Sequence, residues 1–287
     1  MNQKEKIAIV DQLRLFIQQK GSQNKASAAL KGVSPAVVSH LLNGNWEPYS
    51  EEMFRKLGVQ IGYNSQEWQF APTTNGVDLL GLLEDSKTSA LVLSVISNAG
   101  AGKSETTKKF ATENTNVVRI ECGQYWDRKF FLSEILFQLG DKNPSNRIAE
   151  MMRDIVMRFK KMEHPQLIID EVDKIDDNVL LFLITLYNEL KGHCSIVILA
   201  TYFLRKRFEN GLRLKKKGYE ELNSRFGRFY ELEDTNYQDI KVLCEANGLK
   251  DESIIKTIAK NAKGDLRAVS DSIIASRIDD KRKLLAS

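Results

Sequence analysis

One short stretch of the chain has the residue types and the spacing to bind phosphate. It reads Ser97-Asn98-Ala99-Gly100-Ala101-Gly102-Lys103-Ser104, follows an apolar run, and leads into a helix-like segment that begins with Glu105. In that context backbone N–H groups of the loop converge on phosphates, and the helix N-terminus adds positive partial charge. Lys103 would reach the β- and γ-phosphates, and Ser104 would place its hydroxyl on Mg²⁺. We therefore expect residues 97–105 to bind ATP or ADP.

The loop departs from the usual phosphate-binding pattern at its first position. That pattern begins with glycine, and this chain has Ser97 there. Gly100 and Gly102 keep the loop flexible, so we expect a more constrained first turn and a working site. The alternative is a chance Gly/Ala turn in front of a helix.

A second stretch fits the same site. Residues 166–171 form an apolar run that ends in Asp170 and Glu171. Parallel sheets bind ligands at the carboxyl ends of their strands, so these carboxylates are expected beside the phosphate loop. Asp170 would hold Mg²⁺ through water or through Ser104, and Glu171 would polarise the attacking water. The alternative is a strand that ends in a solvated acidic turn, but the adjacent Asp-Glu pair favours hydrolysis over mere binding.

The elements that must position these residues alternate between strands and helices. This alternation predicts an α/β fold with a parallel sheet and crossover helices. The predicted strands are residues 90–96, 117–121, 166–170, 195–200 and 228–232. A first helix is expected over 77–84, and later helices are expected to start near Lys103, Arg128, Asn146 and Asp177. We expect three domains: 1–71, a core over 72–233, and a small helical lid over 234–287.

The N-terminal region predicts a helix-turn-helix. Apolar spacing indicates a helix over 4–19, a short helix follows Ser22, and Ser34-Pro35 is a strong start for a helix that runs to Leu42. The stretch from Ser22 to Gly44 resembles the repressor-type helix-turn-helix, whose second helix enters the major groove. By that resemblance, the residues that face DNA or its backbone are Ser34, Ala36, Val37, Ser39 and His40. These side chains are small and mostly polar, so we expect weak sequence preference. A three-helix protein-interaction module is the alternative.

Three further residues lie in the order that a ring- or filament-forming ATPase would use. Thr201 ends the apolar run 195–200, where a polar side chain would bond to water or the γ-phosphate. Arg225, with Arg228 as second choice, would neutralise transition-state charge across a subunit boundary. Arg267 would close on the nucleotide from the helical lid. The alternative for each is an ordinary solvated or ion-paired residue.

This order of motifs resembles the AAA+ ATPase family over about residues 77–285. Together with the helix-turn-helix in front, the layout looks like the transposition ATPases typified by the phage Mu B protein. The resemblance implies a protein that binds ATP and Mg²⁺, polymerises on duplex DNA with little sequence preference, and delivers target DNA to a transposase. It also implies slow ATP hydrolysis that loosens the filament.

The charge distribution favours a DNA partner. Between Tyr202 and Arg228 the chain has nine arginine and lysine side chains against three glutamates, although its overall net charge is only +4. Clustered basic side chains suit a phosphate backbone. The candidate DNA contacts here are Arg205, Lys206, Arg207, Arg213, Lys215, Lys216 and Lys217, and a smaller aromatic and basic patch near Tyr125 adds Arg128 and Lys129. The alternative is a solvated helix or a face that meets a neighbouring subunit.

Composition adds few constraints. The chain of 287 residues is 28% charged and 42% hydrophobic, and its three cysteines have no metal-binding spacing. We found neither a leader sequence nor an apolar run of membrane-spanning length, so the expectation is a cytoplasmic protein without a membrane partner.

The leading interpretation is therefore an ATP-dependent protein that assembles on DNA and serves a transposase. Three alternatives stay open: a replication initiator or helicase loader, a sequence-specific regulator with an ATPase switch, and an ATPase that binds only proteins.

Overall fold

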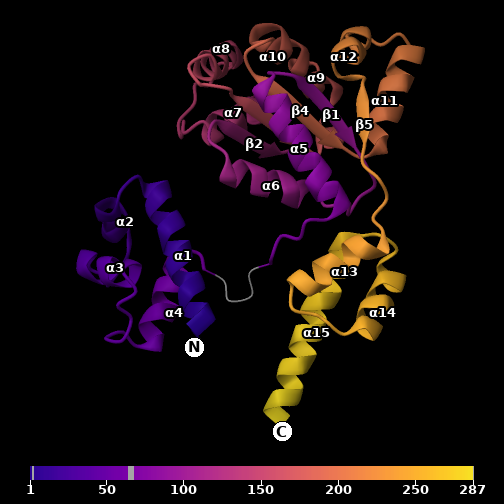
Figure 1. The fold of residues 1–287 in the computed structure, drawn as a ribbon. Coiled ribbons are helices and arrows are strands. Elements are labelled where there is room, and N and C mark those ends of the chain that lie inside the picture. The colour runs from indigo at the N-terminus through magenta and orange to yellow at the C-terminus, as the bar shows by residue number, and fades with distance from the viewer. Residues whose placement is uncertain (2, 64–67, 287) are drawn as a thin grey trace. The chain divides into compact units, whose positions relative to one another are not determined.

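A computed structural model describes residues 1, 3–63 and 68–286 of the chain (Figure 1). It divides into two compact units, Met1–Trp68 and Gln69–Ser287, which are described in turn. Within the described residues, no helix is both long enough and apolar enough to cross a membrane.

The described residues of the first unit form four helices, and the first three match the predicted ones. They are α1 (Gln3–Lys20), α2 (Gln23–Ala29), α3 (Pro35–Leu42) and α4 (Glu51–Gln60). A serine hydroxyl accepts a backbone N–H bond at the start of three of them: Ser22 for α2, Ser34 for α3 and Ser50 for α4. The helices enclose a small apolar core that includes Leu13, Val38, Leu41, Phe54 and Leu57.

The second unit is built on a parallel five-stranded sheet. Its strands are β1 (Val92–Ile96), β2 (Val117–Glu121), β3 (Gln166–Asp170), β4 (Ser195–Ala200) and β5 (Phe229–Glu231), in the order β2-β3-β4-β1-β5. Every residue of β3 and β4 is buried, which explains their unbroken apolar runs. The prediction of an α/β fold with a parallel sheet is confirmed.

Helices cover both faces of this sheet (Figure 1). In chain order the segments are α5 (Thr74–Thr88), α6 (Lys103–Glu113), α7 (Arg128–Gln138), α8 (Ile148–Phe159), the 3₁₀ turn η1 (Val172–Lys174), α9 (Asp177–Leu180), α10 (Phe182–Leu190), α11 (Tyr202–Arg213) and α12 (Tyr219–Phe226). On one face, α5 and α6 pack Leu79, Leu83 and Phe110 against the strands. On the other face, helices α7 to α12 form the larger apolar cluster.

Three more helices complete the second unit: α13 (Tyr237–Ala246), α14 (Glu252–Ala262) and α15 (Leu266–Ala286). Two buried polar side chains bond them to the segment that leads into α5. Asp239 accepts bonds from the backbone and hydroxyl of Thr74 at 2.6 and 2.9 Å, and the Asn247 amide pairs with both backbone groups of Gln69 at 3.0 Å.

The structure corrects several predicted element boundaries. The first strand starts at Val92 because Ala90 adopts a positive φ of 48°, and β5 starts at Phe229, after Arg228. The helix expected near Asn146 begins at Ile148, and α5 is longer than the predicted 77–84 because Thr73 caps it. Helices α10, α11 and α12 were not predicted. The division into three domains stays a prediction.

A polar cluster joins α9 to α11 and α12. Asp177 accepts bonds from the Tyr219 hydroxyl at 2.6 Å and from Arg207 Nε at 3.0 Å, with Lys216 Nζ at 3.3 Å. Burial alone would raise the pKa of Asp177, but these donors outweigh burial and lower that pKa to about 2. Arg207 also donates to the Ile175 carbonyl at 2.6 Å. The cluster therefore holds the basic helix α11 and the helix α12 to α9.

This cluster predicts an acid-dependent loss of stability. Replacing Asp177 by Asn is expected to lower the free energy of unfolding by about 1–2 kcal/mol at pH 7, a value discounted for partial exposure. Because the folded-state pKa lies below the unfolded value of 3.8, this stabilisation is present above pH 3.8 and is lost as the pH falls towards 2. Urea unfolding at pH 7, at pH 3.8 and as close to pH 2 as the wild type stays folded measures it. The neighbouring Asp176→Asn is the control, since Asp176 forms no capping bond. A difference that does not change with pH would contradict this assignment.

Candidate functional site

The predicted phosphate loop lies between β1 and α6, as the sequence indicates. Gly100 and Gly102 have φ values of 79° and 87°, in the left-handed region that glycine enters without strain. Gly102 caps α6 and has no side chain to occupy its first N–H groups. The start of α6 can therefore donate these N–H groups to an anion.

Lys103 stands at the first position of α6 and folds back over the loop. Its ammonium group donates to the Ser97 hydroxyl and to the Asn98 carbonyl, the latter at 3.2 Å. Burial lowers the pKa of Lys103, and the carboxylates of Asp170 and Asp173 oppose that shift. Ser97, which replaces the usual glycine, thus supplies a hydroxyl that holds the lysine at the loop.

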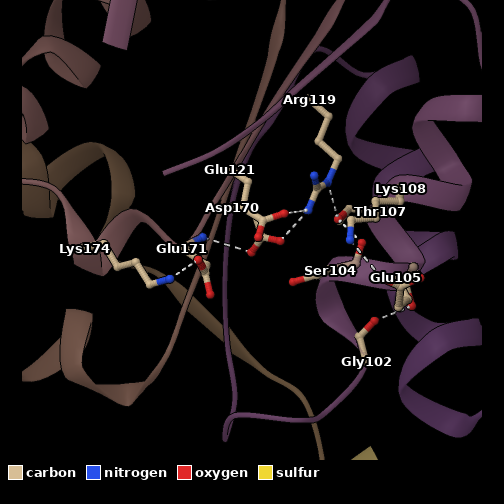
Figure 2. Close-up of polar contacts among 11 residues, drawn as sticks. Gly102, Ser104, Glu105, Thr107, Lys108, Arg119, Glu121, Asp170, Glu171 and Lys174 are labelled. Atoms are coloured by element: carbon tan, nitrogen blue, oxygen red, sulfur yellow. Dashed lines mark hydrogen bonds and ion pairs between the residues drawn. The ribbon is translucent and has the colours of Figure 1, made fainter. Parts of the chain in front are cut away.

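The two predicted carboxylates lie at the end of β3, opposite the start of α6 (Figure 2): Asp170 is the last residue of the strand and Glu171 follows it. Asp170 is 1% exposed, and its Oδ1 accepts the N–H of Glu171 at 2.9 Å. Glu171 has a positive φ of 56° and forms an ion pair with Lys174. The Ser104 hydroxyl projects from α6 towards these carboxylates (Figure 2). The structure therefore brings together the loop and the acidic strand end.

A residue that the sequence analysis missed completes this polar group. Arg119, on β2, donates from Nη2 to Asp170 Oδ2 at 2.7 Å and from Nε to the Thr107 hydroxyl of α6 at 2.9 Å. It also approaches Glu121 at 3.1 Å (Figure 2). Its position in an apolar strand was the one indication in the sequence, because charged residues are rarely buried without a partner.

Thr201 lies at the end of β4, where it was predicted. Its hydroxyl and backbone N–H both donate to Asp173 Oδ2, at 2.5 and 3.2 Å. The hydroxyl also caps α11. Asp173 is therefore a second residue that the sequence analysis missed, and it connects Thr201 to the turn that carries Glu171.

The start of α15 contacts the phosphate loop directly. The Gly100 carbonyl accepts the N–H of Leu266 at 2.9 Å, and Asn98 donates to Asp234 at 2.8 Å. Arg267 is exposed, and its charge contributes to the lowered pKa of Lys103. The C-terminal helices thus bring Arg267 into the electrostatic environment of the loop.

The predicted arginine pair at the end of α12 differs in its contacts. Arg225 donates to the Asn188 side chain at 3.2 Å and stacks on Tyr187, with its guanidinium carbon 5.4 Å from the ring centre. Arg228 is exposed, and its side chain forms no hydrogen bond or ion pair with any described residue. Arg225 is therefore held within its own subunit, and Arg228 is free to contact another molecule.

Several of the predicted DNA contacts have partners inside the chain. Arg207 is committed to Asp177, Arg205 pairs with Glu231 at 2.6 Å, and Lys216 approaches Asp177. Arg213 bonds to Asn210, and Lys129 bonds to Asn146. Four predicted contacts are exposed and have no such partner among the described residues: Lys206, Lys215, Lys217 and Arg128.

In the first unit the candidate DNA contacts all lie on or before α3. Ser34 caps the helix, and Val37 packs partly against the core. Ser39 is partly buried, and the exposed His40 bonds through Nδ1 to the Tyr49 hydroxyl at 2.8 Å. These placements leave the DNA assignment a prediction.

The residues at the loop fit a Mg²⁺ ion that arrives with phosphates. Mg²⁺ prefers oxygen ligands, keeps several waters, and is held by one or two carboxylates together with substrate phosphates. In the part of the chain that the structure describes, no cluster of three or more His, Cys, Asp or Glu side chains is arranged for a metal. The hydroxyl of Ser104 and the carboxylate of Asp170 supply the donor types that a shared protein and phosphate site needs.

Comparison with known proteins agrees with this geometry. Residues 86–208 match the family model for the AAA domain. The fold of the chain is similar to the ORC1 protein of Aeropyrum pernix in complex with DNA, at 14% identity and a TM-score of 0.56, with 77% of this chain and 63% of that one covered. It is also similar to Cdc6p of Pyrobaculum aerophilum, at 16% identity and a TM-score of 0.56, with 75% and 65% covered.

The similarity to these two structures concerns the fold. At such identities they show a shared fold, and the chain spans less than two thirds of the length of either structure. No curated protein matches the sequence.

The contact between Gly100 and α15 gives a stability prediction. A Cβ on Gly100 would lie 2.0 Å from Asp265 Oδ1 and 3.0 Å from its Cα, so Gly100→Ala must push the start of α15 away. We expect a loss of about 1–3 kcal/mol and faster amide exchange at Leu266. Unfolding and hydrogen-exchange measurements test this.

The matched control is Gly81→Ala. Gly81 lies inside α5, and a Cβ there meets nothing within 4 Å. The alanine is expected to stabilise the helix by about 0.5–1 kcal/mol. Unchanged protection of Leu266 in Gly100→Ala would show that α15 does not rest on the loop.

Proposed function

We propose that the AAA domain binds ATP with Mg²⁺ and hydrolyses it. The observation that carries this proposal is the convergence of Lys103, Ser104 and the carboxylates of Asp170 and Glu171 on one phosphate-type loop. A half-buried lysine beside open helix N–H groups suits a triphosphate, which carries several negative charges. The adjacent carboxylates suit a metal ion and an attacking water.

In this proposal each residue of the site has one role. Lys103 leaves its bonds to Ser97 and Asn98 and holds the β- and γ-phosphates. Glu171 leaves Lys174 and polarises the water that attacks the γ-phosphate. Thr201, fixed by Asp173, orients that water or the γ-phosphate. Mg²⁺, held by Ser104 and Asp170, would neutralise phosphate charge.

Two variants test the proposed hydrolysis. Lys103→Ala is expected to lower ATP affinity at least tenfold, because it removes the charge at the phosphates. Glu171→Gln is expected to keep ATP binding and to lower turnover about 100-fold or more, because it removes the general base. Binding of a fluorescent ATP analogue and phosphate release measure the two effects. Lys108→Ala is the control, since Lys108 lies on α6 and pairs only with exposed Glu105. Unchanged turnover in both site variants would refute the proposal.

We further propose that the chain binds DNA. Two features support it: the helix pair α2–α3, whose sequence resembles a repressor helix-turn-helix, and the exposed basic side chains of the segment 202–228. The solved relative from Aeropyrum pernix is in complex with DNA. In this proposal Ser34, Val37, Ser39 and His40 approach the backbone, and the basic segment adds a salt-sensitive contact.

The basic segment gives a measurable prediction. Lys215→Gln with Lys217→Gln is expected to weaken duplex binding and to reduce the slope of log affinity against log salt by about 1 to 2. The control is Lys160→Gln with Lys161→Gln, an exposed pair on the same unit in which Lys160 lies 4.0 Å from Glu189. Equal affinity and slope in both double variants would exclude the basic segment from the DNA contact.

Among DNA-dependent ATPases, we favour the initiator or loader type. The fold likeness to ORC1 and Cdc6p supports it. The transposition type is the second candidate, supported by the order of motifs behind a helix-turn-helix. Both assemble as oligomers, and the exposed Arg228 is a better candidate than Arg225 for an arginine that acts across a subunit boundary.

Electron microscopy distinguishes the two candidates. With a slowly hydrolysed ATP analogue and random-sequence duplex, continuous coating of the DNA would support the transposition type. Discrete rings or short arcs would support the initiator or loader type. Particles of one subunit under these conditions would refute assembly in both.

A further inference from the structure

The side chain of Arg119 connects three elements of the nucleotide site. It is 12% exposed and reaches Asp170 at the end of β3, Glu121 on its own strand, and Thr107 on α6 (Figure 2). No other side chain of the site contacts both the acidic strand end and the phosphate-loop helix among the bonds that the structure describes.

The sheet register explains how Arg119 reaches Asp170. Residues two apart on a strand share a face, and Glu121 lies beside Asp170 in the parallel pairing of β2 with β3. The Arg119 side chain therefore extends along that face, in the chain direction, over the length of two residues to reach Asp170. Its Nε bond to Thr107 anchors the guanidinium to α6, and the Thr107 hydroxyl in turn donates to the Ser104 carbonyl at 3.0 Å.

This arrangement occupies both oxygens of Asp170. Oδ2 accepts Arg119 at 2.7 Å, and Oδ1 accepts the N–H of Glu171 at 2.9 Å. The carboxylate is buried, so a positive charge at this distance acts on it with little screening. A divalent cation that approaches Asp170 meets a carboxylate whose charge is partly balanced by Arg119, which also pairs with Glu121.

We propose that Arg119 makes Mg²⁺ binding at Asp170 conditional on nucleotide. The inference rests on the proposed ATP site and adds a positioning residue to it. Without phosphates, the paired carboxylate attracts Mg²⁺ weakly. With a triphosphate on the loop, the phosphate charges supply the attraction, and Asp170 needs only to hold a water of the ion. That indirect role suits Mg²⁺, which dehydrates reluctantly, and it lets the arginine keep its bond.

The proposal predicts a gain of metal binding when the arginine charge is removed. Arg119→Gln leaves Asp170 and Glu121 without a counter-charge. Nucleotide-free Mn²⁺ affinity is expected to rise about tenfold or more, measured from the free-Mn²⁺ signal in electron paramagnetic resonance. Arg119→Lys keeps the charge and is expected to stay within about threefold of the wild type. A merely structural role for Arg119 would not raise metal affinity.

Two further variants locate the gained site. Arg119→Gln with Asp170→Asn is expected to lose the gain, because the unmasked carboxylate is gone. Arg158→Gln is the matched control. Arg158 lies on α8 and pairs with Asp141 at 3.0 Å, away from the nucleotide site. Removing the Arg158 charge frees the Asp141 carboxylate and is expected to leave Mn²⁺ affinity unchanged.

Mn²⁺ binding by the wild type tests the proposal even if Arg119→Gln does not fold. Without nucleotide, wild type and Asp170→Asn are expected to bind Mn²⁺ equally weakly. Tight Mn²⁺ binding by the wild type that Asp170→Asn abolishes would overturn the inference, and so would a folded Arg119→Gln with unchanged affinity. Failure of the proposed function has a different signature: the fluorescent ATP analogue would not bind in the presence of Mn²⁺, whatever the metal alone does.

Discussion

The buried carboxylate of Asp170 is the charge that the other polar groups of the nucleotide site contact or act on. A carboxylate that is 1% exposed has lost its water and must be paired. Arg119 supplies a counter-charge from β2, the Glu171 backbone supplies an N–H, and the charge of Asp170 opposes the lowered pKa of Lys103. The strand order β2-β3-β4-β1 brings these groups together, since β3 lies between β2, which carries Arg119, and β4, which Thr201 follows.

The phosphate loop is shared between the sheet and the C-terminal helices. Its Gly100 carbonyl bonds to Leu266, and the space above Gly100 is filled by Asp265, so glycine is required there for packing as well as for its φ. The same C-terminal helices hold Gln69 through Asn247, whose own carbonyl accepts Arg277 of α15 at 2.5 Å. One group of helices therefore contacts both the loop and the first residue of the second unit, Gln69.

How much of the structure the sequence predicted depended on how far apart in the chain the interacting residues lie. The loop, the five strands and the start of α6 were predictable because strand burial and the Gly-Lys-Ser motif are local patterns. The roles of Arg119, Asp173 and Asp265 were not, because each depends on a partner that only the folded sheet brings near. The partner of Arg119 is 51 residues away, and that of Asp173 is 28 residues away.

The basic segment shows why charge counting overstates a surface. The sequence analysis assigned seven of its arginines and lysines to DNA, but Asp177 and Glu231, which are distant in sequence, occupy Arg207 and Arg205. Asn188 likewise occupies Arg225, which was predicted to act across a subunit boundary. These pairs fix α11 and α12 against the sheet, so the arginines act first in the fold. Lysines 206, 215 and 217 have no such partner among the described residues, and a flexible, strongly hydrated ammonium group suits a contact without base readout. These three exposed lysines are therefore the part of the segment that fits the proposed contact with a phosphate backbone.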